Sequence, residues 1–352
     1  MNLRRIFAAL ATSLAAVGAL VACSSPGAQS DETPGPGQNT QSDLTSSQSN
    51  DALSGDPIAV GLTFIPNVQF SPVYLADFSD VGAPVEIRHH GTDEGLFSAL
   101  ATGDEQLTVA SGDEVLQARA QDLDIVSVGA YYHRYPVEVV VPEDSQIRTL
   151  ADLRDKRVGV PGEFGSSWFG LLAALDEAGL TTDDIEVVSV GFTQAASLVS
   201  GEVDAIVAFV NSEGVSLKQM DFPARSIPLD PGTALVGAAI VTTEEFAQGH
   251  PEQLSRVVSA ITAGTQKAIS DPNAALEATE KWDESLSDAT TRAGAEAVLL
   301  ATIPLWEDAE GQASAVQDLQ QWEAMGPFLA KLLDEPALVQ SAQGAATNEY
   351  VD

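Results

Sequence analysis

Short apolar runs alternate with amphipathic segments along most of the chain. The runs at residues 58–64 and 106–111 contain the β-branched residues typical of strands, and each is followed by apolar positions at helical spacing. Another helical segment, residues 93–103, follows the strand predicted at 85–91 and ends at Gly103, a residue type that often ends helices. This alternation predicts strands joined by helices, which is the order found in a parallel sheet covered by helices.

The alternation stops at a short apolar run, residues 137–144, and then begins again. Helical spacing dominates from residue 234 onward. We therefore expect an α/β fold of two lobes in a clamshell, each lobe a mainly parallel sheet flanked by helices. The expected divisions are 57–140 and 234–352 for the first lobe and 141–233 for the second, with the C-terminal helices in the return to the first lobe. A small ligand would bind between the lobes, beyond the carboxyl ends of the strands.

The N-terminal segment has a different composition. Arg4 and Arg5 precede an apolar run that is short for a membrane-spanning helix and ends with small residues before Cys23. This order is typical of a lipoprotein signal peptide, residues 1–22, with a lipid attached to Cys23 after cleavage; an ordinary secretory signal is the alternative. Residues 23–56 are rich in Ser, Gly, Pro, Gln and Asp, which predicts a disordered tether. We expect a cell-envelope protein, anchored by lipid to the outer face of the cytoplasmic membrane.

The net charge of the chain limits the classes of partner that it can bind. The chain has 51 acidic and 16 basic residues and a formal net charge of −35. Such a field repels nucleic acids and anionic headgroups, so we expect no nucleic-acid partner and no membrane contact apart from the lipid anchor. With Cys23 as the single cysteine, the chain has no internal disulfide to form, and we expect a monomer held together by its core.

Loops after the predicted strands carry side chains suited to a small flat ligand. Ser111 follows one strand and offers a hydroxyl. Tyr131, Tyr132 and His133 follow another and form an aromatic cluster on which a ring could stack, although a histidine in such a place is more often packed or exposed. Asn67 has donor and acceptor atoms for one edge of a heterocycle, and as a turn residue it could instead serve only the backbone.

The glycine turn before the helical segment at 166–180 is the second lobe's candidate loop. Gly162 and Gly165 would let backbone amides approach a ligand. Phe164 or Trp168 would supply a ring face, and Ser166 or the serine after it would cap the helix. The loop is not a nucleotide-binding P-loop, because no lysine follows its second glycine.

Four segments occur in the order found in one family; they are residues 61–76, 159–175, 203–215 and 347–351. Together they resemble the substrate-binding lipoproteins of ABC importers for thiamine pyrimidine precursors, within the wider group of nitrate-, sulfonate- and taurine-binding proteins. The resemblance implies the type II periplasmic binding protein fold and an ABC permease as partner. It also implies that Asn67, Asn211 and Glu213 face the ligand. A yeast branch of this fold synthesises the pyrimidine, but its cysteine-rich motif is absent here.

Catalytic and metal-binding patterns are missing from the sequence. It has no G-x-S-x-G or H-E-x-x-H motif, and no Cys, Asp or Glu stands at metal-ligand spacing beside His89 and His90. We expect no metal, no cofactor and no enzymatic activity. An enzyme of pyrimidine synthesis, a related hydrolase, and a membrane-anchored sensor or adhesion domain are the rival classes.

The function expected is therefore capture of a small flat heterocycle by lobe closure and its delivery to a membrane permease. A thiamine pyrimidine precursor is the first candidate ligand, and riboflavin, which a tyrosine-rich cleft would suit, is the second. A sulfonate or nitrate ligand fits less well, because Arg134 is the only basic residue in the key loops and Glu213 is acidic.

Overall fold

The computed structural model describes residues 55–91 and 94–351. The predicted signal peptide, the lipidation of Cys23 and nearly all of the predicted tether lie outside the described residues. Within them, no helix combines the length and the apolar character needed to cross a membrane.

The first sheet has five strands in the order β2-β1-β3-β10-β4. They are β1 (Ile58–Leu62), β2 (Val85–His89), β3 (Leu107–Ser111), β4 (Ile125–Ala130) and β10 (Ala238–Thr243). Strands β2 and β3 pair with β1 in parallel, whereas β10 is antiparallel to both β3 and β4. Four of the five strands therefore run in one direction, as a mainly parallel sheet requires.

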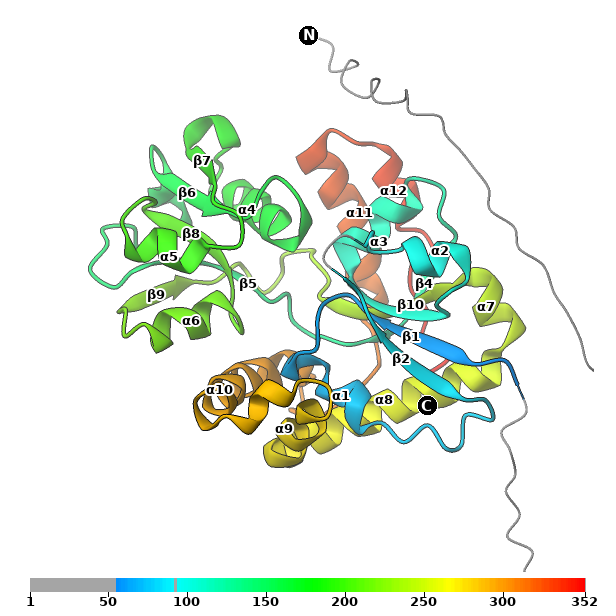
Figure 1. Cartoon of the computed structure of the whole chain (residues 1–352). Helices are drawn as coiled ribbons and strands as arrows, with labels where there is room; N and C mark the ends of the chain where they lie inside the picture. The colour runs from blue at the N-terminus through cyan, green and yellow to red at the C-terminus, as the bar shows by residue number, and fades with distance from the viewer. Residues whose placement is uncertain (1–54, 92–93, 352) are drawn as a thin grey trace, which may run out of the picture. The chain divides into compact units, whose positions relative to one another are not determined.

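The second sheet has the order β7-β6-β8-β5-β9. Its strands are β5 (Val137–Pro142), β6 (Arg157–Val160), β7 (Glu186–Ser189), β8 (Ala205–Phe209) and β9 (Ala224–Ile227). Here β5 is the strand of opposite direction, antiparallel to both β8 and β9. In Figure 1 all its strands are green, because they come from one continuous stretch of chain, whereas the first sheet combines blue and cyan strands with the later β10.

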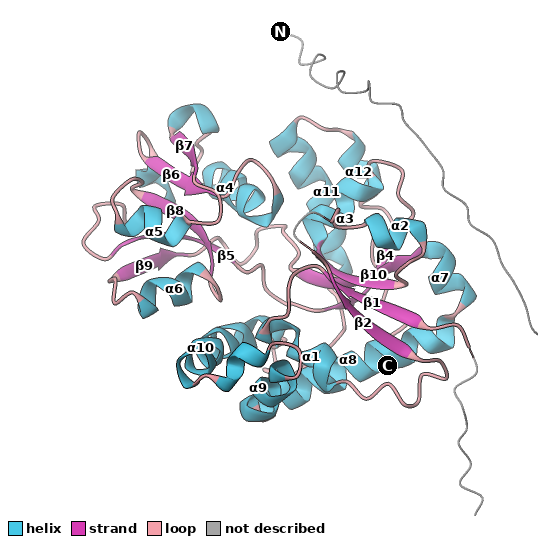
Figure 2. Cartoon of the chain, in the orientation of Figure 1, coloured by secondary structure: helices cyan, strands magenta, loops and turns pink. Residues whose placement is uncertain are grey.

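Helices cover both sheets, as Figure 2 shows. The α-helices are α1 (Ser71–Leu75), α2 (Ser98–Thr102), α3 (Gly112–Arg119), α4 (Gly165–Glu177), α5 (Gln194–Val199), α6 (Glu213–Gln219), α7 (Glu244–Gly249), α8 (Pro251–Ser270), α9 (Pro272–Glu280), α10 (Ala289–Trp306), α11 (Leu319–Leu333) and α12 (Ala337–Ser341). Short 3₁₀ helices lie at Val68–Phe70, Leu150–Leu153, Thr182–Asp184 and Glu284–Ser287.

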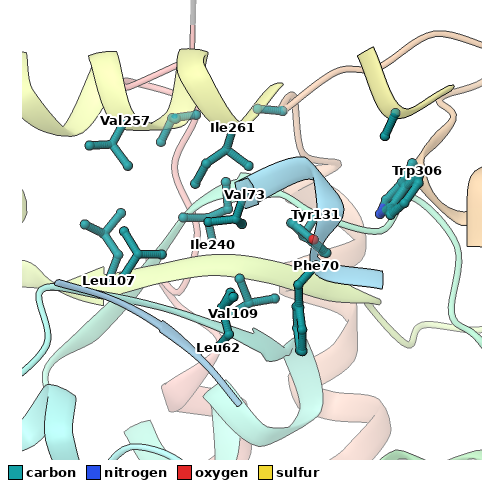
Figure 3. Packing of buried hydrophobic residues seen from close by; sticks show 14 of the residues in the cluster. Leu62, Phe70, Val73, Leu107, Val109, Tyr131, Ile240, Val257, Ile261 and Trp306 are labelled. Atoms are coloured by element: carbon teal, nitrogen blue, oxygen red, sulfur yellow. The ribbon is translucent and has the colours of Figure 1, made fainter. Parts of the chain in front are cut away.

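The two faces of the first sheet bury separate cores. Along β10, Ile240 belongs to one core, while its neighbours Ala239 and Val241 belong to the other, as the two-residue period of a strand demands. Figure 3 shows the first core, in which Val257 and Ile261 of α8 lie over the sheet. Burial on both faces explains why these strands have uninterrupted apolar runs instead of alternation.

Helix α8 approaches the chain of α1 very closely at one glycine. A Cβ atom on Gly264 would lie 2.0 Å from the carbonyl oxygen of Pro72. Only the absence of a side chain at this position allows α8 to seat against α1, which connects directly to the loop after β1.

Several local predictions are confirmed and a few need correction. The helix predicted to end at Gly103 does so, with that glycine in the left-handed conformation. The helical spacing that follows residues 58–64 gives only a short helix, which stops at Leu75 because Ala76 is already extended. The expected lobe boundary after residue 140 falls inside β5, a strand that pairs only within the second sheet.

Candidate functional site

A cavity of about 400 Å³ lies beyond the carboxyl ends of β1, β3, β4, β6 and β8. Strand ends of both sheets therefore contribute to one cavity, as expected for an α/β protein that binds a small ligand. Its polar lining consists of Thr63, Gln69, Ser111, Glu114, Ser166, Ser167, Gln194 and Glu213. No Lys, Arg or His belongs to the lining formed by the described residues.

Aromatic rings dominate the apolar lining. They are Phe64, Phe70, Tyr131, Tyr132, Phe164, Phe192 and Phe209. Phe70 and Tyr131 are also buried in the core, and the Tyr131 hydroxyl donates to the Gln69 carbonyl at 2.7 Å. By contrast Phe64, Phe164 and Phe192 are 50%, 58% and 83% exposed. These three large rings are therefore left in water beside the cavity.

One carboxylate enters the lining from each lobe. In the first lobe Glu114 lies in the first turn of α3, and its Oε2 accepts from the Ser111 backbone N–H at 3.2 Å. In the second lobe Glu213 begins α6, and its Oε2 accepts from the Phe209 backbone N–H at 2.8 Å. Burial raises the pKa of both carboxyl groups above their ordinary value. Each lobe thus contributes to the cavity one carboxylate that accepts a backbone N–H from the end of a strand.

A second acidic group lies behind the lining. Asp113 is fully buried, and its side chain accepts from Ser111 at 2.9 Å, from Tyr135 at 2.7 Å and from Ser166 at 3.3 Å. Burial and, to a lesser extent, the neighbouring Glu114 raise the pKa of Asp113 to about 7. The prediction that Ser166 or Ser167 caps the helix is wrong: α4 begins at Gly165 with Phe164 as an N-cap that makes no side-chain bond. The Ser166 hydroxyl instead reaches across to the first lobe.

Seven of the predicted binding residues line the cavity: Ser111, Tyr131, Tyr132, Phe164, Gly165, Ser166 and Glu213. Five others do not: Asn67, His133, Gly162, Trp168 and Asn211. The roles of all twelve in ligand binding stay predictions.

Each of the five has another partner. Asn67 accepts from the Gln69 backbone N–H at 3.1 Å and so caps a 3₁₀ helix, and His133 contacts the Ser314 carbonyl at 2.7 Å. Asn211 is buried and donates to the Thr302 hydroxyl at 3.0 Å. Trp168 packs between two apolar cores. A Cβ on Gly162 would lie 2.4 Å from the Phe164 ring, so this glycine fixes where that ring lies.

Sequence reasoning missed Glu114, Phe192, Gln194 and Phe209. Phe209 ends β8, and Phe192 and Gln194 follow β7, so the rule that ligands bind after strands could have found them. Glu114 carried a different signal, a capping box with Ser111, which indicates a helix start and says nothing about a cavity.

The statement that no carboxylate stands beside the histidine pair is also corrected. Glu94 and Glu105 come within 4.8 Å of His90 through one ligand atom each. The guanidinium of Arg88 joins both carboxylates, at 2.7 Å from Glu94 and 2.6 Å from Glu105, so a cation already neutralises this group. The buried Glu105 carboxylate packs against Gly61 of β1. Only glycine leaves room for it, because a Cβ at this position would lie 2.1 Å from the carboxylate.

Comparison with known proteins identifies relatives along most of the chain. The model of the family described as NMT1/THI5 like matches residues 67–275. A riboflavin-binding protein of Chloroflexus aurantiacus is 27% identical over 306 residues, which are 84% of this chain and 86% of that protein. A formylaminopyrimidine-binding protein of Halalkalibacterium halodurans is 24% identical over 317 residues, or 87% and 96% of the two chains.

Solved structures agree on the fold. The periplasmic aliphatic sulphonate-binding protein of Escherichia coli superposes with a TM-score of 0.65 at 18% identity, covering 85% of this chain and 92% of that one. The two-lobed fold of a periplasmic binding protein, expected from the sequence, is therefore confirmed.

Proposed function

Because this chain belongs to the NMT1/THI5-like family, as its sequence resemblance indicated, we propose that it is the substrate-binding component of an ABC-type importer. It captures a small flat heterocycle between its lobes and delivers it to a membrane permease. The relatives named for binding riboflavin and formylaminopyrimidine support this role. No catalytic step is part of the proposal.

The charged and aromatic residues that line the cavity support the proposed class of ligand. A sulfonate or another anion would face Glu114 and Glu213 with no cation in the lining to balance its charge, although a structural neighbour binds sulphonates. A heterocycle with N–H donors would instead give each carboxylate a hydrogen bond and place its ring against aromatic side chains.

Riboflavin is the ligand that we propose first, ahead of the pyrimidine precursor. The observation that favours it is the extent of ring surface: three exposed phenylalanines border the cavity in addition to its four more enclosed rings. The two carboxylates keep an aminopyrimidine as the second candidate, because its amino group is a donor for an acidic acceptor.

Thermal unfolding in the presence of each compound tests this proposal. Riboflavin, a formylaminopyrimidine and an alkanesulfonate are compared at equal concentration. A ligand present at 100 times its Kd adds about 2.7 kcal/mol of apparent stability. A shift with the sulfonate and none with either heterocycle would overturn the proposed ligand class.

Phe192 gives a sharper prediction. Because its ring is 83% exposed, Phe192→Ala should leave the unfolding temperature of the free protein unchanged. The same change should weaken riboflavin binding by about fivefold, since a ring contact is worth about 1 kcal/mol. Leu300→Ala, which removes another exposed apolar side chain outside the cavity lining, is the control and should leave affinity unchanged. Equal affinities of the Phe192 variant and the wild type would remove this ring from the site.

We also propose that Cys23 carries the lipid anchor and that the protein acts as a monomer at the outer face of the cytoplasmic membrane. The order of charged, apolar and small residues before Cys23 supports the anchor. The mass of the mature N-terminal peptide tests it directly, because a diacylated cysteine and a plain N-terminus differ by the lipid.

A further inference from the structure

Five side chains or backbone groups meet where the lobes touch behind the cavity. Ser111, Asp113 and Glu114 come from the end of β3 and the start of α3 in the first lobe. Ser166 comes from α4 of the second lobe, and Tyr135 from the connection between β4 and β5. We call these five residues the interlobe cluster.

The interlobe cluster has more close oxygen pairs than hydroxyl protons. Six oxygen–oxygen distances between 2.6 and 3.3 Å connect its members. Two oxygens form a hydrogen bond only with a proton between them, yet Ser111, Tyr135 and Ser166 supply only one hydroxyl proton each for the six pairs. Ser111 lies 2.9 Å from the Asp113 carboxyl and 2.6 Å from the Glu114 carboxyl and can donate to only one of them. A proton added to Asp113 or Glu114 lets that carboxyl group donate to the Ser111 oxygen. Without it, the carboxyl group that receives no proton from Ser111 would face that oxygen as a second acceptor.

No cation offsets the two carboxyl groups. At the far end of α3, Arg119 bonds to Glu244 and to backbone carbonyls. Lys331 of α11 pairs with Asp176 near the far end of α4. Strands β3, β4 and β10 and helix α12 carry no charged side chain.

Glu213 lies across the cavity in the second lobe, and two other acids on neighbouring segments lie in solvent. Glu163, before α4, and Glu323, on α11, are exposed. Two neighbouring buried carboxylates without a counter-charge would repel each other, so at least one is neutral when the lobes touch.

We propose that Asp113 joins the two lobes as a neutral, protonated acid, so that lobe closure takes up a proton and ligand capture is stronger in acid. This inference rests on the proposed function, since it concerns the closure of the same cavity. Asp113 acts as a positioning residue: it lies behind the lining and affects the ligand only through the arrangement of Ser111 and Ser166.

The sign of the pH dependence follows from burial. When the lobes separate, Asp113 loses Ser166 and gains water, and its pKa returns toward the ordinary value; when they close, its pKa rises to about 7. The stabilisation of the closed form is thus complete in acid and is lost as the pH rises through the pKa of the closed form. Affinity for riboflavin should fall by about tenfold between pH 6 and pH 8.5.

Titration of riboflavin against wild type and Asp113→Asn between pH 5.5 and pH 8.5 tests this. Asparagine stays neutral at every pH and can still accept from Ser111 and donate toward Ser166, so in this variant the affinity should no longer fall as the pH rises. Glu323→Gln, which neutralises an exposed acid on a helix that packs against α3, should keep the wild-type slope. A wild-type slope in Asp113→Asn, or a flat profile in the wild type, would overturn the proposal.

Thermal unfolding without ligand separates this inference from the proposed function. Free protein in which the lobes touch, as they do in the structure, must bury a charge at Asp113 only in the wild type. The unfolding temperature of Asp113→Asn should therefore rise relative to the wild type as the pH rises from 6 to 8.5. If riboflavin does not bind but the difference in unfolding temperature between variant and wild type grows with pH, the proposed ligand is wrong and the interlobe cluster still takes up a proton. If the difference does not open, the inference fails whatever binds.

Tyr135→Phe provides a second variant should the asparagine protein fold poorly. The Tyr135 hydroxyl donates to Asp113 at 2.7 Å and thereby lowers the pKa of that carboxyl group. Its removal should move the midpoint of the pH profile to higher pH. An unmoved midpoint would contradict the proton's place on Asp113.

Discussion

Replacing Glu213 by alanine should weaken the binding of riboflavin or an aminopyrimidine by about 10- to 100-fold. The expected loss reflects one charge-assisted hydrogen bond, worth about 1.5–3 kcal/mol, inside a cavity that offers the ligand donors no other acidic acceptor from the second lobe. Isothermal titration of the two heterocycles measures it. Because the pKa of Glu213 is raised by burial, the comparison is made at pH 8, where its carboxylate form is favoured.

Two further variants separate the ligand contact from the bond that Glu213 makes to the end of β8. Glu213 also accepts the Phe209 backbone N–H, so alanine removes that bond together with a ligand contact. Glu213→Gln keeps a neutral acceptor for that N–H and should retain the stability of the free protein while still losing affinity. Glu186→Ala removes an exposed acid of the second lobe and should bind as the wild type does. Unchanged affinity in both Glu213 variants would exclude this carboxylate from the site.

Gly264→Ala should lower the free energy of unfolding by about 3 kcal/mol. The added methyl group would lie 2.0 Å from the Pro72 carbonyl oxygen, so α8 and α1 must separate, and overpacking of this kind costs about 1–3 kcal/mol. This outcome opposes the usual effect of alanine in a helix, which favours it over glycine by about 1 kcal/mol. Urea denaturation measures the change.

The matched control is the same substitution in a neighbouring helix. A Cβ on Gly249, at the end of α7, would meet no atom within 4 Å. Gly249→Ala should therefore leave the midpoint of denaturation nearly unchanged. Equal effects at the two glycines would show that the approach of α8 to α1 relaxes at no cost.

Local chemistry made the order of strands and helices predictable from the sequence. The left-handed glycine at the end of α2 and the apolar runs of β1, β3, β6 and β8 specify their own structure. The rule that ligands bind after strands pointed to Ser111 and Tyr131, and the family resemblance pointed to Glu213; all three line the cavity.

The remainder depended on contacts distant in sequence. Ser166 looked like a helix cap because its partner Asp113 lies 53 residues away. Glu105 approaches His90 only once β2 and β3 have both paired with β1, which lies between them. Asn67 could bind either a ligand or its own backbone, and the local geometry of a 3₁₀ turn satisfied its side chain first. A single sequence does not show which of several competing partners a side chain will bind in the folded protein.

The place of β10 between β3 and β4 sets an order of assembly during synthesis. Strands β3 and β4 each pair with β10, and neither pairs with the other. All strands of the second sheet have been made once the chain reaches Ile227, whereas the first sheet lacks its connecting strand until Thr243 has emerged. The N-terminal strands therefore wait, with unpaired edges, for a segment translated after the whole second sheet, and the part of the protein made first is the last that can be completed.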